Sequence, residues 1–267
     1  MDRTRPRRSI ADERSIRLQR ESGIAEIAIS QPARRNAMSR GMWVELAEVV
    51  RELDPATRAV IVSGSGAEAF SAGADISEFA DAYRDREAAA DYSRIVSDGQ
   101  RALAACPVPV IAAIEGVCFG GGCGIALAAD LRFAGRDARF AITPAKIGAA
   151  YSFADTRQLV DIVGPSRAKD MLFSGRVLDA EEALRIGLID RLVETGGALG
   201  AARAYAADIA GLSRVSHAVT KRTIEAIRAG ADAPDEALER AHLDAFEAAD
   251  FREGYGAFLA KRRPRFS

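Results

Sequence analysis

Residues 114–124 read IEGVCFGGGCG, and this stretch decides the fold. An apolar, strand-like run ends at its start, and three consecutive glycines then open an apolar helix that we expect to end near Asp130. The first N–H groups of a helix have no partner within the helix and lie at its positive dipole end. The stretch therefore predicts a strand, a tight turn and a helix start whose backbone donors are free for a ligand.

A second glycine turn lies upstream at residues 69–76, which read AFSAGADI. It follows a predicted strand, its small side chains let a ligand approach the backbone, and Gly73 permits an unusual turn. Each loop on its own is equally compatible with a purely structural turn. The glycine run lacks GxxxxGK[ST], and it lacks GxGxxG followed by a ribose-binding acid, so nucleotide-binding loops are not indicated. The specific signal is the order of strand, AGAD turn, helical segment, strand and glycine helix start.

Short apolar runs alternate with helical patterns, which indicates an α/β fold. Ser39 is placed to cap one helix, and Asp179 with Glu182 forms a capping-box-like start of another, which Gly187 ends. From about Gly197 the strand signal fades, and amphipathic segments continue to a basic end. The predicted strands cover residues 24–30, 59–63, 110–115, 131–134 and 189–193.

The composition excludes several functional classes. The 267 residues are 48% hydrophobic, and 37 basic side chains nearly balance 38 acidic ones, so bulk charge gives no reason to expect a nucleic-acid or membrane partner. Cys106, Cys118 and Cys123 lack CxxC spacing, and His217 and His242 are too few for multi-histidine metal sites. We therefore expect a soluble, cytoplasmic protein with buried thiols, no metal and no membrane span.

Three blocks, taken together, resemble the crotonase superfamily, the enoyl-CoA hydratase/isomerase family. They are FSAGADI at residues 70–76, EGVCFGGGCGIALAAD at 115–130 and FSGRVLDAEEALRIGLIDRLV at 173–193. The resemblance runs from about Ile16 to Phe266. The basic residues at the start of the chain predict a flexible tail over residues 1–12, and the resemblance implies a ββα spiral core over 13–196 and a helical trimerisation region over 197–267. It also implies an acyl-CoA thioester as substrate, coenzyme A being part of that substrate and no further cofactor being needed, and a homo-trimer or hexamer.

The resemblance also assigns site residues. The N–H groups of Ala74 and Gly121 would form an oxyanion hole for the thioester oxygen, where negative charge develops as an enolate forms. The turn around Arg35 and the 72–76 loop would face coenzyme A, with Arg35 near phosphate, and two C-terminal residues would reach it, sometimes in a neighbouring subunit. A solvated role for these charges is the alternative, and Asp75 is expected to order the loop. The implied substrate-binding set is Arg35, Ala37, Ala72, Asp75, Ile76, Phe258 and Lys261.

The sequence departs from the hydratase pattern at both catalytic glutamates, which family hydratases use to activate water and to protonate the α carbon. The first glutamate position, three residues beyond the oxyanion glycine, is Gly124, and gap-free matching puts Pro144 at the second. Neither side chain can transfer a proton. The resemblance therefore implies coenzyme A binding more strongly than hydration, and we expect weak hydration of short enoyl-CoA substrates.

Residues 143–151, TPAKIGAAY, are similar to methylmalonyl-CoA decarboxylase-type members, whose tyrosine lies beside the reacting carbon and matches Tyr151. Decarboxylation of a malonyl-type thioester needs an oxyanion hole and a pocket for the carboxylate, not two glutamates. Such decarboxylases, however, carry a histidine where this chain has Ala74, and commonly an acid at Gly124. Tyr151 is equally compatible with a core aromatic whose hydroxyl is satisfied.

Three further polar residues lie close to these segments: Glu115, Ser152 and Asp155. Ser152 matches a position where some isomerases and a dehalogenase of the family place an aspartate. Glu115 and Asp155 are candidate bases if they face the pocket, and capping or surface roles are the alternative. Because the glutamates are missing, a non-catalytic acyl-CoA-binding or scaffolding protein is the third reading of the chain.

Overall fold

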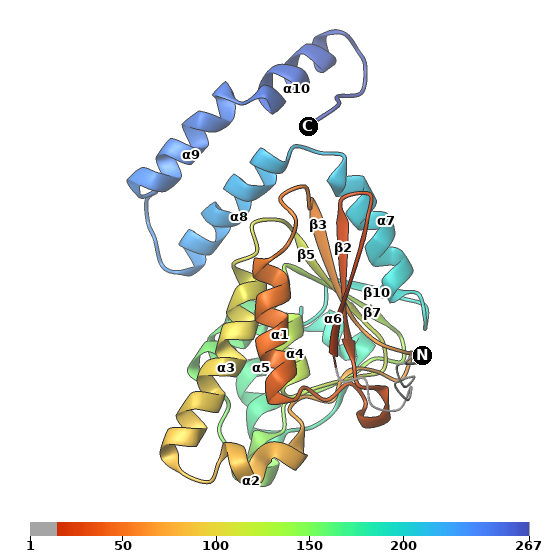
Figure 1. The fold of residues 1–267 in the computed structure, drawn as a ribbon, viewed down its shortest axis with the longest axis vertical. Coiled ribbons are helices and arrows are strands. Elements are labelled where there is room, and N and C mark those ends of the chain that lie inside the picture. The colour runs from red at the N-terminus through yellow and green to blue at the C-terminus, as the bar shows by residue number, and fades with distance from the viewer. Residues whose placement is uncertain (1–14, 267) are drawn as a thin grey trace, which may run out of the picture.

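The computed structural model describes residues 15–266, and the basic tail predicted over residues 1–12 lies outside them. The chain forms two β-sheets and surrounding helices (Figure 1). The strands are β1 (Ser15–Glu21), β2 (Ile24–Ser30), β3 (Ala59–Gly64), β4 (Ala69–Ser71), β5 (Val110–Ile114), β6 (Val117–Phe119), β7 (Leu131–Gly135), β8 (Arg139–Ala141), β9 (Leu178–Asp179) and β10 (Arg191–Val193).

The larger sheet has the order β1-β2-β3-β5-β7-β10, and all its pairs are parallel except β1 with β2. The smaller sheet has the order β4-β6-β8-β9, with only the β8–β9 pair antiparallel. Three successive strand pairs, β3–β4, β5–β6 and β7–β8, each place one strand in each sheet before the chain enters a helix. This repetition confirms the α/β fold and the expected ββα spiral.

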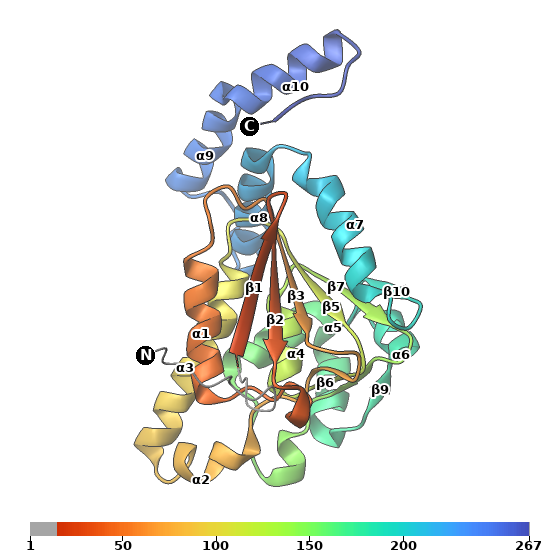
Figure 2. The ribbon, with the colours of Figure 1, turned by 45° about the vertical axis from the view of Figure 1, so that its right-hand side comes forward.

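The helices are α1 (Arg40–Arg51), α2 (Phe79–Ala82), α3 (Arg86–Ala104), α4 (Gly121–Ala128), α5 (Phe153–Ser174), α6 (Ala180–Arg185), α7 (Ala198–Ala210), α8 (Arg214–Arg228), α9 (Glu236–Glu247) and α10 (Ala249–Leu259). Both predicted caps are present, because the Ser39 side chain accepts the Met42 N–H and the Asp179 side chain accepts the Glu182 N–H. The packed α1 and α3 lie on one side of the larger sheet and α7 lies on the other (Figure 2).

One predicted strand begins two residues late. Residues 189–193 read as a strand, but β10 starts at Arg191. The N–H groups of Leu188 and Ile189 donate to the Ala183 carbonyl at the end of α6, so they close that helix instead of joining the sheet. The apolar pattern therefore reflects burial of Leu188 and Ile189, not strand pairing.

The helical C-terminal region is present, and its first helix packs differently from the rest. Small side chains of α7, Ala198, Ala202 and Ala206, are fully buried against Ile61 and Phe133 of the larger sheet. In contrast, α9 and α10 extend beyond the sheets (Figure 1). None of the described helices is long and apolar enough to cross a membrane. Cys106, Cys118 and Cys123 are buried and free, as the sequence predicts.

Candidate active site

The two glycine loops meet because they follow neighbouring strands. Strands β4 and β6 run parallel, with Ser71 paired to Cys118, so the chain leaves both at the same edge of the smaller sheet. A Cβ atom built on Gly73 would lie 3.1 Å from the Gly121 nitrogen, and one built on Gly121 would lie 3.6 Å from the Ala74 nitrogen. The nitrogens that the resemblance pairs are therefore close in space, and the φ of +95° at Gly73 makes this turn possible.

Both of these N–H groups are unpaired, and their peptide planes are fixed from the opposite side. Within residues 15–266, neither the Ala74 nor the Gly121 N–H donates to a protein acceptor. The carbonyl of Gly73 accepts the Met38 N–H at 2.7 Å, and that of Gly120 accepts the Gly124 N–H at 3.1 Å. Two unpaired donors with fixed peptide planes therefore lie close together.

Tyr151 supports the same loop. Its half-buried hydroxyl donates to the Gly120 carbonyl at 3.2 Å, and that carbonyl belongs to the peptide unit whose N–H is that of Gly121. Burial raises the pKa of Tyr151 well above its usual value, so the phenol stays protonated at neutral pH. Tyr151 is thus a fixed donor that orients a peptide plane, not a free base.

The 72–76 loop is held by the buried Asp75. The carboxylate of Asp75 accepts bonds from the Arg34 guanidinium at 2.7 Å, from the Ser77 hydroxyl at 2.7 Å and from the Gln31 amide at 3.2 Å. Burial acts to raise the pKa of Asp75, but the bonds from Ser77 and Gln31, with Arg34, lower it to about 2. Asp75 therefore stays charged and fixes the loop beside Ala74.

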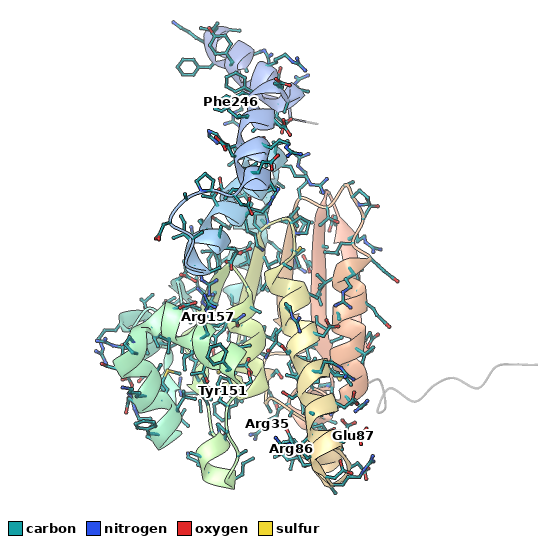
Figure 3. All side chains as sticks on the ribbon, turned by 90° about the vertical axis from the view of Figure 1, so that its left-hand side faces the viewer. Arg35, Arg86, Glu87, Tyr151, Arg157 and Phe246 are labelled. Carbon is teal, nitrogen blue, oxygen red and sulfur yellow. The ribbon has the colours of Figure 1, made fainter. Side chains whose placement is uncertain are left out.

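The other residues expected at coenzyme A from this part of the chain lie together. The Ala72 N–H donates to the Arg35 carbonyl at 2.9 Å, which joins the loop to the preceding turn. Arg35 is exposed with a left-handed φ of 51°, Ala37 is buried, and Ile76 is 71% exposed at the surface. Arg35 and Tyr151 lie in the same half of the molecule, away from Phe246 on α9 (Figure 3).

The two C-terminal residues of the expected set do not reach these loops within one chain. Phe258 lies on α10 and is 80% exposed, and the exposed Lys261 follows that helix. The helix α10 lies at the opposite end of the molecule from α2 and the loop that leads into it (Figure 1). A contact of Phe258 or Lys261 with a substrate at Ala74 would therefore come from another subunit.

The vacant side-chain position at Gly124 is filled by two other polar groups. A Cβ atom at Gly124 would lie 2.1 Å from Gln100 Nε2 and 2.9 Å from Asp155 Oδ1. Gln100 comes from α3 and Asp155 from α5, so helices from two sides converge there. Sequence reasoning missed Gln100, although a polar residue on the buried face of α3, beside Leu103, was an available signal.

A surface role for Asp155 is wrong, because only 5% of the residue is exposed. The Ser152 hydroxyl donates to Asp155 Oδ2 at 2.6 Å and accepts the Asp155 N–H, so Ser152 caps α5. The atoms Asp155 Oδ1 and Gln100 Nε2 are buried and have no hydrogen-bond partner within residues 15–266. Burial raises the pKa of Asp155, while the bond from Ser152 and the neighbouring Gln100 amide oppose that rise.

Glu115 does not act at the glycine loop. Its carboxylate accepts the N–H groups of Gly196 at 3.1 Å and Ala198 at 2.8 Å, at the start of α7. Asp137 lies beside it, since Glu115 Oε2 and Asp137 Oδ1 would lie 2.1 and 2.9 Å from a Cβ atom at Gly135. Burial and the neighbouring Asp137 raise the pKa of Glu115, while the two N–H groups oppose that rise.

We expect Asp137→Asn to stabilise the protein at neutral pH by about 1 kcal/mol. A carboxyl whose pKa is raised by folding loses stability as pH rises from its ordinary value of 4.5 through the raised one. Asparagine removes the like charge beside Glu115 and can donate to it. Urea unfolding should give equal stabilities below pH 4.5 and a difference at neutral pH. The exposed Asp244→Asn is the control, and an equal change in both variants would contradict the pairing.

Comparison with known proteins gives the class to which this fold and these loops belong. The profile of the family described as enoyl-CoA hydratase/isomerase matches residues 19–267. The crotonyl-CoA hydratase of Syntrophomonas wolfei is 32% identical over 94% of this chain and 97% of its own length. This chain belongs to the enoyl-CoA hydratase/isomerase family.

Solved structures agree with that assignment. A protein of Hyphomonas neptunium assigned to the enoyl-CoA hydratase/isomerase family is 44% identical, with a TM-score of 0.91 over 94% of this chain and 97% of that one. An enoyl-CoA hydratase/carnithine racemase of Magnetospirillum magneticum is 34% identical, with a TM-score of 0.89 over 94% and 95% of the two chains.

The described part of the chain places no three His, Cys, Asp or Glu side chains together as a metal site.

Proposed function

We propose that this family member is an acyl-CoA enzyme that stabilises a thioester enolate between the N–H groups of Ala74 and Gly121. The observation that supports this proposal is the convergence of two unpaired donors whose peptide carbonyls are already bonded. When the α carbon loses a proton or a bonded group, the electron pair is delocalised onto the thioester oxygen. Donors fixed in advance stabilise that charge without reorganising.

The identity of the reaction depends on the groups around the α and β carbons. Relatives of this chain bear the name hydratase, but Gly124 and Pro144 offer no side chain that could move a proton. We therefore expect slow hydration of crotonyl-CoA. Family-typical turnover of that substrate would contradict the weight given to these two positions.

Binding of cinnamoyl-CoA tests the polarisation directly. A conjugated thioester absorbs at longer wavelength when its carbonyl is polarised, so the absorbance band should move to the red on binding. Binding without a shift would contradict an oxyanion hole at Ala74 and Gly121. A red shift with no turnover of any thioester in a broad panel would favour the non-catalytic acyl-CoA-binding alternative.

Decarboxylation of a malonyl-type thioester is the second candidate. It is favoured by the absence of an acid at Gly124 and Pro144, and by a protonated Tyr151 phenol beside the glycine loop. Carbon dioxide release from malonyl-CoA and its 2-alkyl analogues, followed by mass spectrometry of the products, is the assay. Wild-type protein inactive on every one of these thioesters would count against this candidate.

We further propose a homo-trimer or a hexamer as the working assembly. Helices α9 and α10 expose large apolar side chains, among them Phe246, Phe251 and Tyr255, which favours their burial by another copy. Such a copy could also bring Phe258 and Lys261 to a neighbouring coenzyme A. Light scattering after size exclusion should give three or six times the 28.4 kDa of one chain, and a monomer mass would contradict the proposal.

A further inference from the structure

The polar atoms behind Gly124 lie on the same side of α4 as the unpaired donor of Gly121. Gly121 and Gly124 are three residues apart in this helix, so a side chain at either position would project from one face. The groups that occupy the space beside Gly124 therefore border the volume that faces the Gly121 N–H. Among them, Asp155 has a carboxyl group, which can accept and donate a proton.

The Asp155 carboxyl lies at about the distance from the Cβ position of Gly124 that the carboxyl of a glutamate at this position would span. The carboxylate oxygens of a glutamate lie roughly 3 Å from its own Cβ, given bonds of about 1.5 Å. Asp155 Oδ1 is 2.9 Å from the Cβ position of Gly124, although its own backbone belongs to α5. The carboxyl group is thus supplied to this volume from a different helix.

We propose that Asp155 is the catalytic acid–base residue of the reaction proposed above, and that Gln100 positions it. The inference rests on the proposed function, because it needs an enolate held at Ala74 and Gly121. Asp155 Oδ2 is occupied by the Ser152 hydroxyl, which leaves Oδ1 as the oxygen that meets the substrate. The Gln100 amide nitrogen lies against the same position, beside the Asp155 carboxylate.

The proton step balances for both candidate reactions. In α-proton exchange, ionised Asp155 takes the α proton and the C–H electron pair forms the enolate. Protonated Asp155 exchanges that proton with water and then returns a solvent proton to the α carbon. In decarboxylation the C–C bond breaks, its electron pair forms the enolate, carbon dioxide leaves, and protonated Asp155 protonates the α carbon before water reprotonates it.

The surroundings of Asp155 leave it able to use both protonation states. Burial raises its pKa, while the bond from Ser152 and the neighbouring Gln100 amide favour the charged form. A titratable group that interacts with it from the glycine-loop side is Tyr151, whose phenol stays neutral. A group with these properties is suited to accept and to donate a proton in one cycle.

Deuterium incorporation from D2O into butyryl-CoA, followed by mass spectrometry, tests the role of Asp155. We expect Asp155→Asn to lower the exchange rate by about 10²- to 10⁴-fold. The red shift of bound cinnamoyl-CoA should remain, because the oxyanion donors are untouched. Asp161→Asn, a matched change on the same helix, should exchange at the wild-type rate. Asp155→Asn exchanging at that rate would overturn the proposal, and loss of the red shift would mean that Asp155 only supports the loop.

The pH dependence of the exchange rate distinguishes a catalytic role of Asp155 from a purely structural one. Exchange by the wild type should rise with pH as Asp155 ionises. In Gln100→Leu the profile should move to higher pH, because a neighbouring amide that favours the charged form of Asp155 is lost. An unchanged profile would overturn the positioning role of Gln100. A wild type that shifts the cinnamoyl band, yet neither exchanges butyryl-CoA nor decarboxylates malonyl thioesters, would overturn the role of Asp155 while leaving the oxyanion hole standing.

Discussion

Replacing Gly121 with proline is expected to lower the rate at which the protein turns over its acyl-CoA thioester by about 10²- to 10³-fold. This loss corresponds to roughly 3 kcal/mol of transition-state stabilisation. Gly121 is the first residue of α4, a position where helices tolerate proline, and proline has no N–H. The change therefore deletes one proposed oxyanion donor. The carbonyl of Gly120 keeps the Tyr151 bond, so the other half of the peptide plane stays held.

Gly121→Ala is the matched control, because it adds the same Cβ and keeps the N–H. That Cβ would lie 3.1 Å from Cζ2 of Trp43, a tight contact that both variants share. The rate ratio of alanine to proline then reports what proline changes beyond the added Cβ, namely the loss of the N–H and the ring Cδ that replaces it. We expect the red shift of cinnamoyl-CoA to shrink in the proline variant only. Equal losses in the two variants, at equal melting temperatures, would mean that the Gly121 N–H does not polarise the substrate.

Gly116→Ala is expected to destabilise the fold by about 3 kcal/mol. Gly116 joins β5 to β6 with a φ of +57°, which costs an alanine about 1 kcal/mol. The added methyl group would also lie 2.0 Å from the Glu68 carbonyl oxygen, and relieving such an overlap costs about 2 kcal/mol. The chain crosses between the two sheets here, so the backbone has little room to move.

Gly66→Ala separates these two costs. Gly66 has a φ of +81°, but no atom lies within 4 Å of its added Cβ. This variant should lose only the conformational cost of the positive φ, about 1 kcal/mol of unfolding free energy. Equilibrium unfolding in urea measures the loss of stability in both variants. Equal losses at the two positions would show that the contact with Glu68 relaxes without cost.

Much of the larger sheet could be predicted from local pattern, and much of the smaller one could not. Strand β2 and the caps at Ser39 and Asp179 follow from periodicity and hydrogen-bonding side chains within a few residues. Strands β4, β6 and β8 have three residues each, too few for a period, and exist because they pair with one another. Their pairing depends on contacts far apart in the chain.

The candidate site divides in the same way. The two glycine loops could be recognised from their order along the chain, and the structure brings Ala74 and Gly121 together. Gln100 could not be assigned in this way, and Asp155 could be named only as a candidate base, because the significance of both depends on an empty position at Gly124, which lies on a third helix. A polar residue on a buried helix face was visible, but not the partner that it meets.

The main chain is proposed to activate the thioester and a side chain to move the proton, and this difference affects how the reaction of the protein could change. The groups proposed to hold the negative oxygen are peptide atoms, fixed by the carbonyls of Gly73 and Gly120. No single side-chain replacement deletes them, apart from proline. The proton-moving group, in contrast, can be supplied from any helix that reaches the same space. In the course of evolution, the acid–base residue could therefore change from a position on α4 to one on α5, and the reaction could change with it. Binding and activation of the thioester would persist.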